Sequence, residues 1–448
     1  MEKDDIEGIT RRQMLGGMAS AGVAFGFPTI IPSTVLDKNA PSNRVVLGMI
    51  GVGRQGLQVN LHTLVNMNDV QIVAVSDVDK WRLNNAKTQV DETYGNKDCK
   101  TYADWREVIA RDDIDAIMDS TPDHWHVPVS LAAVRKGKHV CCEKPLTFSI
   151  AEGRALADAV KKAGVVFRTD SECRSHSYMH KTAELVRNGY IGKLKRIEVG
   201  VPAGDTSGGK ATPMPVPEEL DYDMWMGPIK KKPYTVDAVH PPKSYGRPGW
   251  MRSPDTCEGM ITNWGTHVID VAQLAINTER TGPVSVEGTG KFPDPGSGLW
   301  NVLIDFKVQF EYANGVVMDY IIDSAGAYLR VEGEEGWIQA NWHRKGGLQA
   351  SDINILRNKI KDNELHIPQR SDKGDFIYCI KKNAPELSMA DAEVGHRTCS
   401  MCQLAHIAIK REKKLTWDPS KEIFTNDSEA NKLLTREYRA PWGLDIKI

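Results

Sequence analysis

The sequence lacks an excess of charge of either sign: 57 basic side chains face 59 acidic ones in 448 residues, a formal net charge of −2. This balance gives no electrostatic basis for binding nucleic acid or an anionic membrane. Eight cysteines are too few for a disulfide scaffold in so long a chain. After the first 31 residues no apolar run is long enough to span a bilayer, which excludes a polytopic membrane protein. What remains is an ordinary globular composition, large enough for two domains.

Residues 1–40 are interpreted as an export signal and linker. Arg11 and Arg12 precede a short, weakly apolar stretch, rich in glycine and alanine, from Gly16 to Phe27. Paired arginines before such a run resemble a bacterial twin-arginine signal, which exports folded proteins. The alternative is an amphipathic N-terminal arm. The resemblance predicts a periplasmic protein with no membrane partner in its mature form.

Residues 41–167 are predicted to form a nucleotide-binding domain. The apolar run 45–50 is typical of a strand buried in a parallel sheet. It leads into a G-x-G-x-x-G turn and then into leucines at helical spacing. Backbone N–H groups of such a turn, and the helix N-terminus behind it, can approach a pyrophosphate. The alternative is a glycine turn that binds no nucleotide.

The end of the second strand indicates which dinucleotide is bound. The run 70–76 ends at Asp77, which stands 21 residues after Gly56. A carboxylate at this place accepts hydrogen bonds from ribose hydroxyls and repels a 2′-phosphate, so NAD is favoured over NADP. Arg82 is close enough in sequence to weaken that preference.

Further segments of this half alternate between strand and helix. Strands are expected at 114–122 and 139–142, and helices at 127–136 and from the capping box of Ser149 and Glu152 to Gly164. This alternation predicts an α/β Rossmann fold, a doubly wound parallel sheet.

Three motifs carry a resemblance to a known family. They are Thr121-Pro122-Asp123-His124-Trp125-His126, Gly137-Lys138-His139-Val140 and Glu143-Lys144-Pro145. Together with the glycine turn they resemble the glucose–fructose oxidoreductase / inositol dehydrogenase family (Gfo/Idh/MocA) over essentially the whole chain after residue 43. The resemblance implies a Rossmann domain joined to an α+β domain with a large open antiparallel sheet. It also implies a homodimer or homotetramer that uses the exposed face of that sheet.

Residues 168–448 are expected to form this second domain, which would bind substrate and mediate oligomerisation. Apolar and polar residues alternate strictly over 305–312, and Asn314-Gly315 then turns the chain into the apolar run 316–322. Further strands are expected at 194–199, 284–288 and 328–332. The segment 202–258 holds 10 of the 23 prolines and is interpreted as an ordered lid, with a surface loop as the alternative. The tail around residues 438–442 is expected to pack back on the body.

Lys144 is the first candidate catalytic residue. It follows a parallel strand at the edge of the sheet where ligands bind in such folds. An ammonium group there can hydrogen-bond a reacting oxygen and stabilise a developing alkoxide. The alternative is a solvated loop lysine.

His267 is the second candidate, because it titrates near neutral pH. Family members commonly carry an aspartate four residues before this histidine, and a spacing of four puts both side chains on one helical face. Here the aspartate position holds Asn263, followed by Trp264. Asparagine can orient a sugar hydroxyl but cannot accept a proton. Proton transfer would therefore have to be carried out by Lys144 and His267 alone. A buried structural histidine is the alternative.

Asp170, Glu172 and Arg174 stand where related sequences often carry a neutral stretch. The two carboxylates can bind sugar hydroxyls or supply a further base, or they can form a structural ion pair with Arg174. Asn263 and Trp264 complete the expected substrate-binding set. The residues expected to hold NAD are Gly51, Gly53, Arg54, Gln55, Gly56, Asp77, Thr121, Pro122, His124, His126, Glu143 and Lys144. For His124 and His126, capping and packing roles are the open alternatives. No metal site is assigned, because Cys399-x-x-Cys402 lacks a second pair of ligands.

The leading hypothesis is an exported, NAD-dependent oxidoreductase that converts a ring hydroxyl of a sugar or glycoside to a ketone, or the reverse, with tightly held NAD. The rival uses the same site without net redox change: an NAD-dependent glycosidase that oxidises C3 transiently, eliminates the aglycone, adds water and reduces. The third, least favoured, is a non-catalytic sugar or nucleotide sensor. Retention of Lys144, His267 and the full glycine turn argues against the sensor.

Overall fold

The computed structural model describes residues 43–204 and 208–443. The predicted twin-arginine segment at residues 1–40 lies outside these ranges. The described residues from Val45 onward form one compact unit. Within the described ranges, no helix combines the length and the apolar character needed to cross a bilayer.

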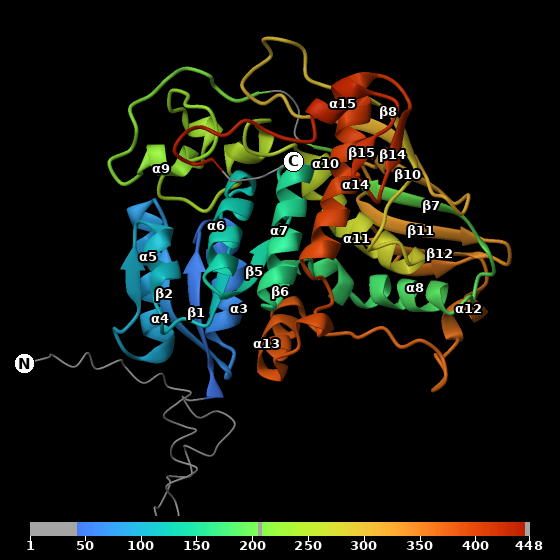
Figure 1. Ribbon diagram of the computed structural model, residues 1–448, viewed down its shortest axis with the longest axis horizontal. Helices are drawn as coiled ribbons and strands as arrows, with labels where there is room; N and C mark the ends of the chain where they lie inside the picture. Colours follow the sequence, from blue (N-terminus) through green and yellow to red (C-terminus); the bar gives the residue numbers. More distant parts are fainter. Residues whose placement is uncertain (1–42, 205–207, 444–448) are drawn as a thin grey trace, which may run out of the picture. The chain divides into compact units, whose positions relative to one another are not determined.

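The first half folds around a six-stranded sheet in which all neighbouring strands are parallel (Figure 1). The strand order β3-β2-β1-β4-β5-β6 is that of a doubly wound dinucleotide-binding sheet, so this prediction is confirmed. The strands are β1 (Val45–Ile50), β2 (Val70–Ser76), β3 (Lys100–Tyr102), β4 (Ala116–Asp119), β5 (His139–Glu143) and β6 (Phe167–Asp170). The sheet therefore continues to Asp170, past the boundary expected at residue 167.

Helices connect these strands, and the local sequence explains where they begin and end. Ser149 and Glu152 form the predicted capping box, and Gly164 ends that helix in the left-handed conformation (φ +65°). The helix predicted at 127–136 begins earlier, at Asp123, because Pro122 forms its N-cap. The helices are η2 (Gly56–Leu61), α3 (His62–Val65), α4 (Lys80–Tyr94), α5 (Trp105–Ala110), α6 (Asp123–Arg135) and α7 (Ile150–Ala163).

A helix from the C-terminal half, α13 (Asp372–Lys382), packs against β6 and β1. Its apolar residues join the core on that side of the Rossmann sheet. Two buried ion pairs tie it to β6: Arg168 to Asp375 at 2.9 Å and Lys373 to Asp170 at 2.5 Å. Because each charge has a partner of opposite sign on α13, β6 can be buried although it carries Arg168 and Asp170. For the same reason the buried sheet extends past residue 167, where the domain was expected to end.

The second half contains a nine-stranded sheet that is antiparallel except for the pairing of β7 with β10. The order is β13-β12-β11-β7-β10-β9-β8-β14-β15, so the predicted large antiparallel sheet is confirmed as a mixed, mostly antiparallel one. The strands are β7 (Leu194–Val201), β8 (Ser285–Lys291), β9 (Asp305–Glu311), β10 (Val317–Ile322), β11 (Ala327–Gly333), β12 (Trp337–Trp342), β13 (Leu348–Ala350), β14 (Leu415–Asp418) and β15 (Ile423–Phe424).

One face of this sheet is buried under helices α8 (Ser177–Arg187), α11 (Gly265–Ile276) and α14 (Ala392–Arg411). In β9 the predicted alternation is found: Phe306, Val308 and Phe310 enter the core. The hairpin from β9 to β10 turns at Gly315, whose φ of +83° suits glycine. The shorter helical segments are η3 (Glu172–Ser175), α9 (Tyr222–Met226), η4 (Val236–Ala238), η5 (Gly249–Arg252), α10 (Met260–Asn263), α12 (Ile353–Arg357), η6 (Pro385–Leu387) and α15 (Ser428–Lys432).

Replacing Asp375 tests the attachment of α13. Its carboxylate also accepts hydrogen bonds from Arg370 and from the backbone N–H of Met389. Asp375→Ala leaves the fully buried Arg168 without its counter-charge and should lower the free energy of unfolding by about 3–5 kcal/mol, measured by urea denaturation.

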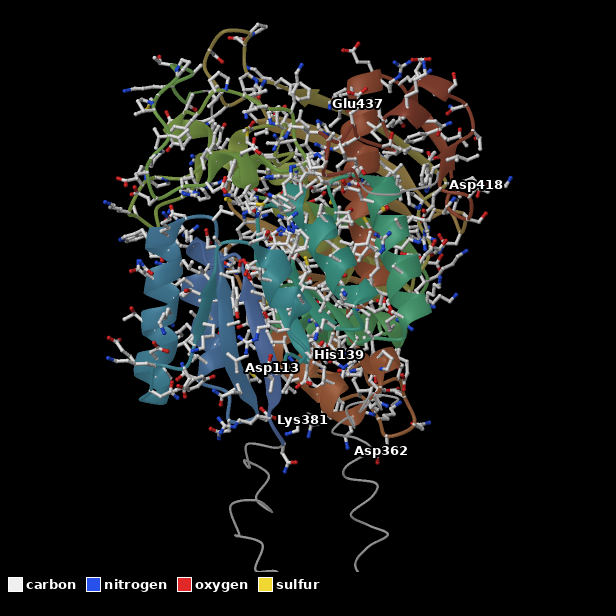
Figure 2. The ribbon with its side chains drawn as sticks, turned by 60° about the vertical axis from the view of Figure 1, so that its left-hand side comes forward. Asp113, His139, Asp362, Lys381, Asp418 and Glu437 are labelled. Atoms are coloured by element: carbon white, nitrogen blue, oxygen red, sulfur yellow. The ribbon has the colours of Figure 1, made fainter. Side chains whose placement is uncertain are left out.

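Asp113→Ala is the control. Asp113 pairs with Arg111 at the surface, close to where β4 begins (Figure 2), and its loss should cost less than about 1 kcal/mol. Equal effects of the two substitutions would contradict the assignment of the buried pair.

Candidate active site

Four strands of the Rossmann sheet end at one large cavity. It has a volume of about 760 Å³ and receives Gly51 after β1, Asp77 after β2, Thr121 after β4 and Lys144 after β5. The carboxyl edge of a parallel sheet is where ligands bind in doubly wound folds. Parallel pairing therefore brings together residues that lie up to 93 positions apart in the sequence.

The glycine turn has the shape that a dinucleotide requires. A Cβ atom on Gly56 would lie 2.2 Å from the carbonyl oxygen of Gly51, and one on Gly51 would lie 2.6 Å from the backbone of Ser120. These two glycines allow the turn to pack against itself and against the end of β4. Gly53 has no heavy atom within 4 Å of its Cβ position and lines the cavity, as do Arg54 and Gln55. The backbone at Gly53 is thus open to a pyrophosphate.

Asp77 is held in place by the backbone. Its two carboxylate oxygens accept hydrogen bonds from the N–H groups of Val52 (2.8 Å) and Asp79 (2.9 Å). Burial raises the pKa of Asp77, and these hydrogen bonds oppose the rise. Its position at the end of β2 and the open glycine turn fit the adenosine half of NAD.

Arg82 is occupied by other partners. Its guanidinium pairs with Asp79 at 2.5 Å and donates to the backbone carbonyls of Ser244 (2.7 Å) and Pro241 (3.0 Å). His240 lies 3.1 Å from the same Asp79 carboxylate. Burial raises the pKa of Asp79, but the His240 and Arg82 interactions outweigh it, so the net shift is downward. We call Asp79, Arg82 and His240 the latch, because they fasten the segment 202–258 to the start of α4.

The segment 202–258 lines the cavity through aromatic and other side chains. Trp225, Tyr245 and Trp250 are among them, together with His240 of the latch. The tail is fastened to the same segment, because Arg439 donates to the carbonyl of Gly227 and pairs with Asp223.

Hydrogen bonds also hold the turns that follow β4 and β5 at the carboxyl edge of the Rossmann sheet. Both ring nitrogens of His126 lie near backbone carbonyls, that of Pro145 at 2.7 Å and that of Thr121 at 2.8 Å. This histidine thus joins the turn after β4 to the turn after β5. Glu143 accepts hydrogen bonds from the Asn60 amide (2.8 Å) and from the backbone N–H of Lys144 (3.2 Å). Thr121, Pro122, His126, Glu143 and Lys144 all line the cavity.

Lys144 and His267 line the same cavity, and the charge of Lys144 acts on the His267 ring. The Lys144 ammonium donates to the backbone carbonyl of Asn263 at 3.4 Å, and Asn263 also lines the cavity. His267 is buried, and no described residue lies within hydrogen-bonding distance of its Nδ1 atom. Burial, the Lys144 charge and His343 lower the pKa of His267 well below its ordinary value, so its imidazole is neutral.

Aromatic rings lie beside His267. Trp264 lies 5.3 Å from Trp342 and 5.6 Å from His343 between ring centroids, and His267 lies 4.9 Å from Trp342. Glu172 also lines the cavity, and burial followed by the charge of Glu143 raises its pKa. An ammonium, a neutral imidazole, a carboxyl group and apolar ring faces suit a polyhydroxylated ring.

Three expected site residues are placed elsewhere, which corrects the predictions made for them. Arg174 is buried between Asp270 (2.7 Å) and Glu279 (2.9 Å), so its expected partners Asp170 and Glu172 are not the ones it uses. Asp170 is bound to Lys373 of α13. Neither Arg174 nor Asp170 lines the cavity; both hold the fold together.

His124 is the third correction. It donates through Nε2 to the carbonyl of Trp225 (3.0 Å) and lines a different, smaller cavity. Because α6 begins at Asp123, consecutive side chains of the motif point in different directions, and His124 turns away from His126.

Several residues of the cavity were not anticipated. Asp123 lines it with an oxygen that no described residue contacts, and burial raises its pKa to about 6. The sequence could have predicted the position of Asp123, because a helix that begins after Pro122 puts Asp123 and His126 on one face. Trp342 ends β12 and His343 follows it, nearly two hundred residues after Lys144, and nothing in their local sequence indicates the cavity.

Comparisons with known proteins agree with this geometry. Residues 45–171 match the description "Oxidoreductase family, NAD-binding Rossmann fold", and residues 181–444 match "Oxidoreductase family, C-terminal alpha/beta domain" of GFO_IDH_MocA. The fold and site define a two-domain, NAD-binding oxidoreductase architecture. The chain belongs to the Gfo/Idh/MocA oxidoreductase family, whose Rossmann domain binds NAD.

Individual relatives match more narrowly. The chain is 30% identical over 176 residues to myo-inositol 2-dehydrogenase of Thermotoga maritima, which covers 39% of this chain and 47% of that protein. It is 29% identical over 198 residues to a glycosyl hydrolase family 109 protein of Stenotrophomonas maltophilia, covering 42% of this chain and 41% of that protein. These alignments thus span less than half of either relative.

A solved structure shows the same fold over most of the chain. The aldose-aldose oxidoreductase from Caulobacter crescentus, complexed with glycerol, superposes with a TM-score of 0.59 at 17% identity, covering 83% of this chain and 99% of that one.

The latch should control how fast NAD leaves. Arg82→Ala removes the donor to Ser244 and Pro241, so the segment 202–258 loosens, and we expect the NAD dissociation rate to rise at least about tenfold, as one charge-assisted hydrogen bond would give. Stopped-flow displacement of NADH, followed by fluorescence, measures it. Lys87→Ala is the control, because Lys87 pairs with Asp91 on the same helix without touching the segment. An unchanged rate in Arg82→Ala would show that the latch does not retain the cofactor.

Proposed function

We propose that the chain oxidises a ring hydroxyl of a sugar or glycoside to a ketone, or runs the reverse reaction, with tightly held NAD. The observation that carries the proposal is that Lys144 and His267 line the same cavity as the glycine turn, with the Lys144 charge acting on the His267 ring. The aromatic rings of Trp264 and Trp342, which lie beside His267, offer apolar surfaces for the faces of a sugar.

The bound nicotinamide supplies the hydride acceptor, and the protein supplies position and proton transfer. Lys144 donates a hydrogen bond to the reacting oxygen and stabilises the negative charge that develops on it. His267 is neutral and accepts the hydroxyl proton, so the carbon loses a hydride, the oxygen loses a proton and a carbonyl forms. Asn263 orients a neighbouring hydroxyl through its side-chain amide.

The redox-neutral glycosidase is the second candidate, and Glu172 favours it. A carboxyl group whose pKa is raised, in the same cavity as Lys144, can serve as the acid or base that elimination and hydration require. The similarity to a glycosyl hydrolase family 109 protein supports it as well.

Export and assembly complete the proposal. Arg11 and Arg12 support export of the folded protein through the twin-arginine route to the periplasm. Free NAD is scarce there, and the latch over the adenosine end of the cavity is consistent with a cofactor that stays bound. We place the interface of a homodimer or homotetramer on the uncovered face of the second sheet, where Arg196 and Asp319 form an ion pair.

Lys144→Met tests the catalytic assignment. It keeps the length of the side chain and removes the charge that stabilises the alkoxide, so turnover should fall about 10²–10⁴-fold with NAD still bound. NADH formation at saturating glycoside measures turnover, and equilibrium dialysis measures bound NAD. Unchanged turnover would remove Lys144 from the mechanism; Lys138→Met, whose ammonium binds backbone carbonyls at the opposite edge of the sheet, is the matched control.

The protonation state of His267 gives a second test. Because its pKa is lowered, the ring should remain neutral as the pH falls through 6.5 and should gain a proton only well below that pH. Histidine-selective NMR of the NAD-bound protein follows the ring, and His267→Gln identifies its signal. A midpoint at or above 6.5 would contradict the lowered pKa that burial and the Lys144 charge give this ring.

A further inference from the structure

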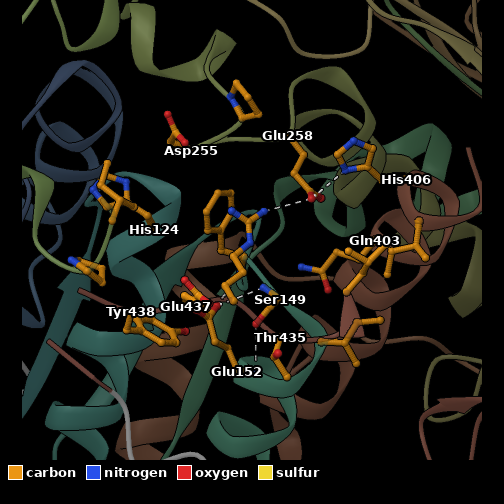
Figure 3. Close-up of a pocket in the computed structure, with 18 of the residues that line it drawn as sticks. His124, Ser149, Glu152, Asp255, Glu258, Gln403, His406, Thr435, Glu437 and Tyr438 are labelled. Carbon is orange, nitrogen blue, oxygen red and sulfur yellow. Dashed lines mark hydrogen bonds and ion pairs between the residues drawn. The ribbon is translucent and has the colours of Figure 1, made fainter. Parts of the chain in front are cut away.

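A second cavity, of about 330 Å³, adjoins the site described above. It is lined by side chains from α6, α7 and α14, from the end of the segment 202–258 and from the tail after α15 (Figure 3). His124 lies in its wall, and the carbonyl of Trp225 accepts hydrogen bonds from both His124 and Trp125. Because Trp125 and Trp225 line the first cavity, the two cavities share a wall.

Three buried acceptor atoms on side chains that line the second cavity have no hydrogen-bond partner among the described residues. They are His124 Nδ1, Glu258 Oε2 and Gln403 Oε1, on side chains that are 2%, 8% and 4% exposed. An unsatisfied buried polar atom costs about 1–3 kcal/mol, so native proteins rarely leave one without a partner. Three around one cavity indicate a missing group that donates hydrogen bonds.

The other contacts of His124 identify its Nδ1 as an acceptor. The Trp225 carbonyl can only accept, so Nε2 of His124 carries the proton and Nδ1 presents a lone pair. Burial lowers the pKa of His124 to about 4, which keeps the ring neutral at physiological pH.

The other contacts of Glu258 and Gln403 likewise identify the free oxygen of each side chain as a hydrogen-bond acceptor. One carboxylate oxygen of Glu258 pairs with His406 (2.8 Å) and Arg436 (3.1 Å), and the other is unpartnered. Burial raises the pKa of Glu258, but these partners bring it to about 2, so the group is an anion and accepts only. The Gln403 amide nitrogen donates to the carbonyl of Thr147 (3.0 Å), which leaves its oxygen as the free acceptor.

The charges of the wall favour a neutral ligand over a cation. Arg436 and two lysines, Lys230 and Lys410, offset the carboxylates of the lining. Burial raises the pKa of Glu152 to about 7, so this carboxyl group is partly uncharged at neutral pH. An ammonium ligand would find no excess of negative charge to replace its hydration.

We propose that this cavity is a second binding site, for a neutral polyhydroxylated molecule of about the size of a monosaccharide. Hydroxyl groups supply the donors that His124, Glu258 and Gln403 lack, and each hydroxyl can accept in return from Arg436 or Lys410. The hydroxyl of Tyr438 is also without a described partner, and its ring adds an aromatic surface at the rim. The site does not depend on Lys144 or on turnover.

Crystals of the NAD-loaded full chain, soaked in turn with D-glucose, myo-inositol and D-glucitol, test the proposal directly. We expect at least one of these probes in the second cavity, with hydroxyls on the three acceptors. Ordered water alone on those acceptors, with every probe, would overturn the proposal.

Binding in solution gives an independent answer. Equilibrium dialysis of a labelled probe should show affinity for the second cavity about tenfold weaker in Gln403→Met, the loss of one hydrogen bond to a buried acceptor. Gln273→Met is the matched control: Gln273 is also buried with an unpartnered oxygen among the described residues, but it lines neither cavity. If Gln403→Met does not fold, Tyr438→Phe, which removes only a hydroxyl group, provides the same test of affinity for the second cavity.

Equal affinities in Gln403→Met, Tyr438→Phe and Gln273→Met would also overturn the proposal. Because these experiments measure binding without turnover, they succeed or fail independently of the proposed oxidation. Loss of activity in Lys144→Met with probe still bound in the second cavity would show that the two sites are separate.

Discussion

The parallel register of the Rossmann sheet is the constraint on which the site depends. Parallel strands end at a common edge, and here that edge collects a glycine turn, the Asp77 carboxylate and Lys144 from three different strands. No single segment contains the site. The segment 202–258 and the second domain then close around the edge, held by the latch and by the contact of Lys144 with the backbone of Asn263.

Burial gives chemically similar groups different roles in this molecule. His267 is neutral beside the ammonium of Lys144 and is available to accept a proton. His124 is also neutral, but its single proton is committed to Trp225. Arg174 and Asp170 are buried in ion pairs with Asp270 and Lys373 and line neither cavity, so they stabilise the fold. Residue type alone does not assign these roles; the partner of each group does.

The sequence predicted the elements whose signals are local. The glycine turn, the strand ending at Asp77, the capping box at Ser149 and the alternation in β9 each combine a few neighbouring residues, and each is found as expected. The two-sheet architecture followed from these signals and from the family resemblance.

Contacts between residues that are far apart in the sequence could not be predicted from such local signals. Lys373 neutralises Asp170 from about two hundred residues away, and no periodicity connects the two. The same holds for Trp342 and His343, which reach the cavity through the topology of the second sheet. His124 was misplaced for a different reason, because the start of α6 was expected four residues too late and a helix turns by about 100° per residue.

The most direct test of the central claim is a mass spectrum of the products formed in D₂O from a panel of simple glycosides with NAD supplied. The proposed oxidation predicts a product lighter by about 2 Da with the glycosidic bond intact, because the cofactor keeps the hydride. Free aglycone, together with a sugar that carries one solvent deuterium, would contradict it and establish the redox-neutral glycosidase instead.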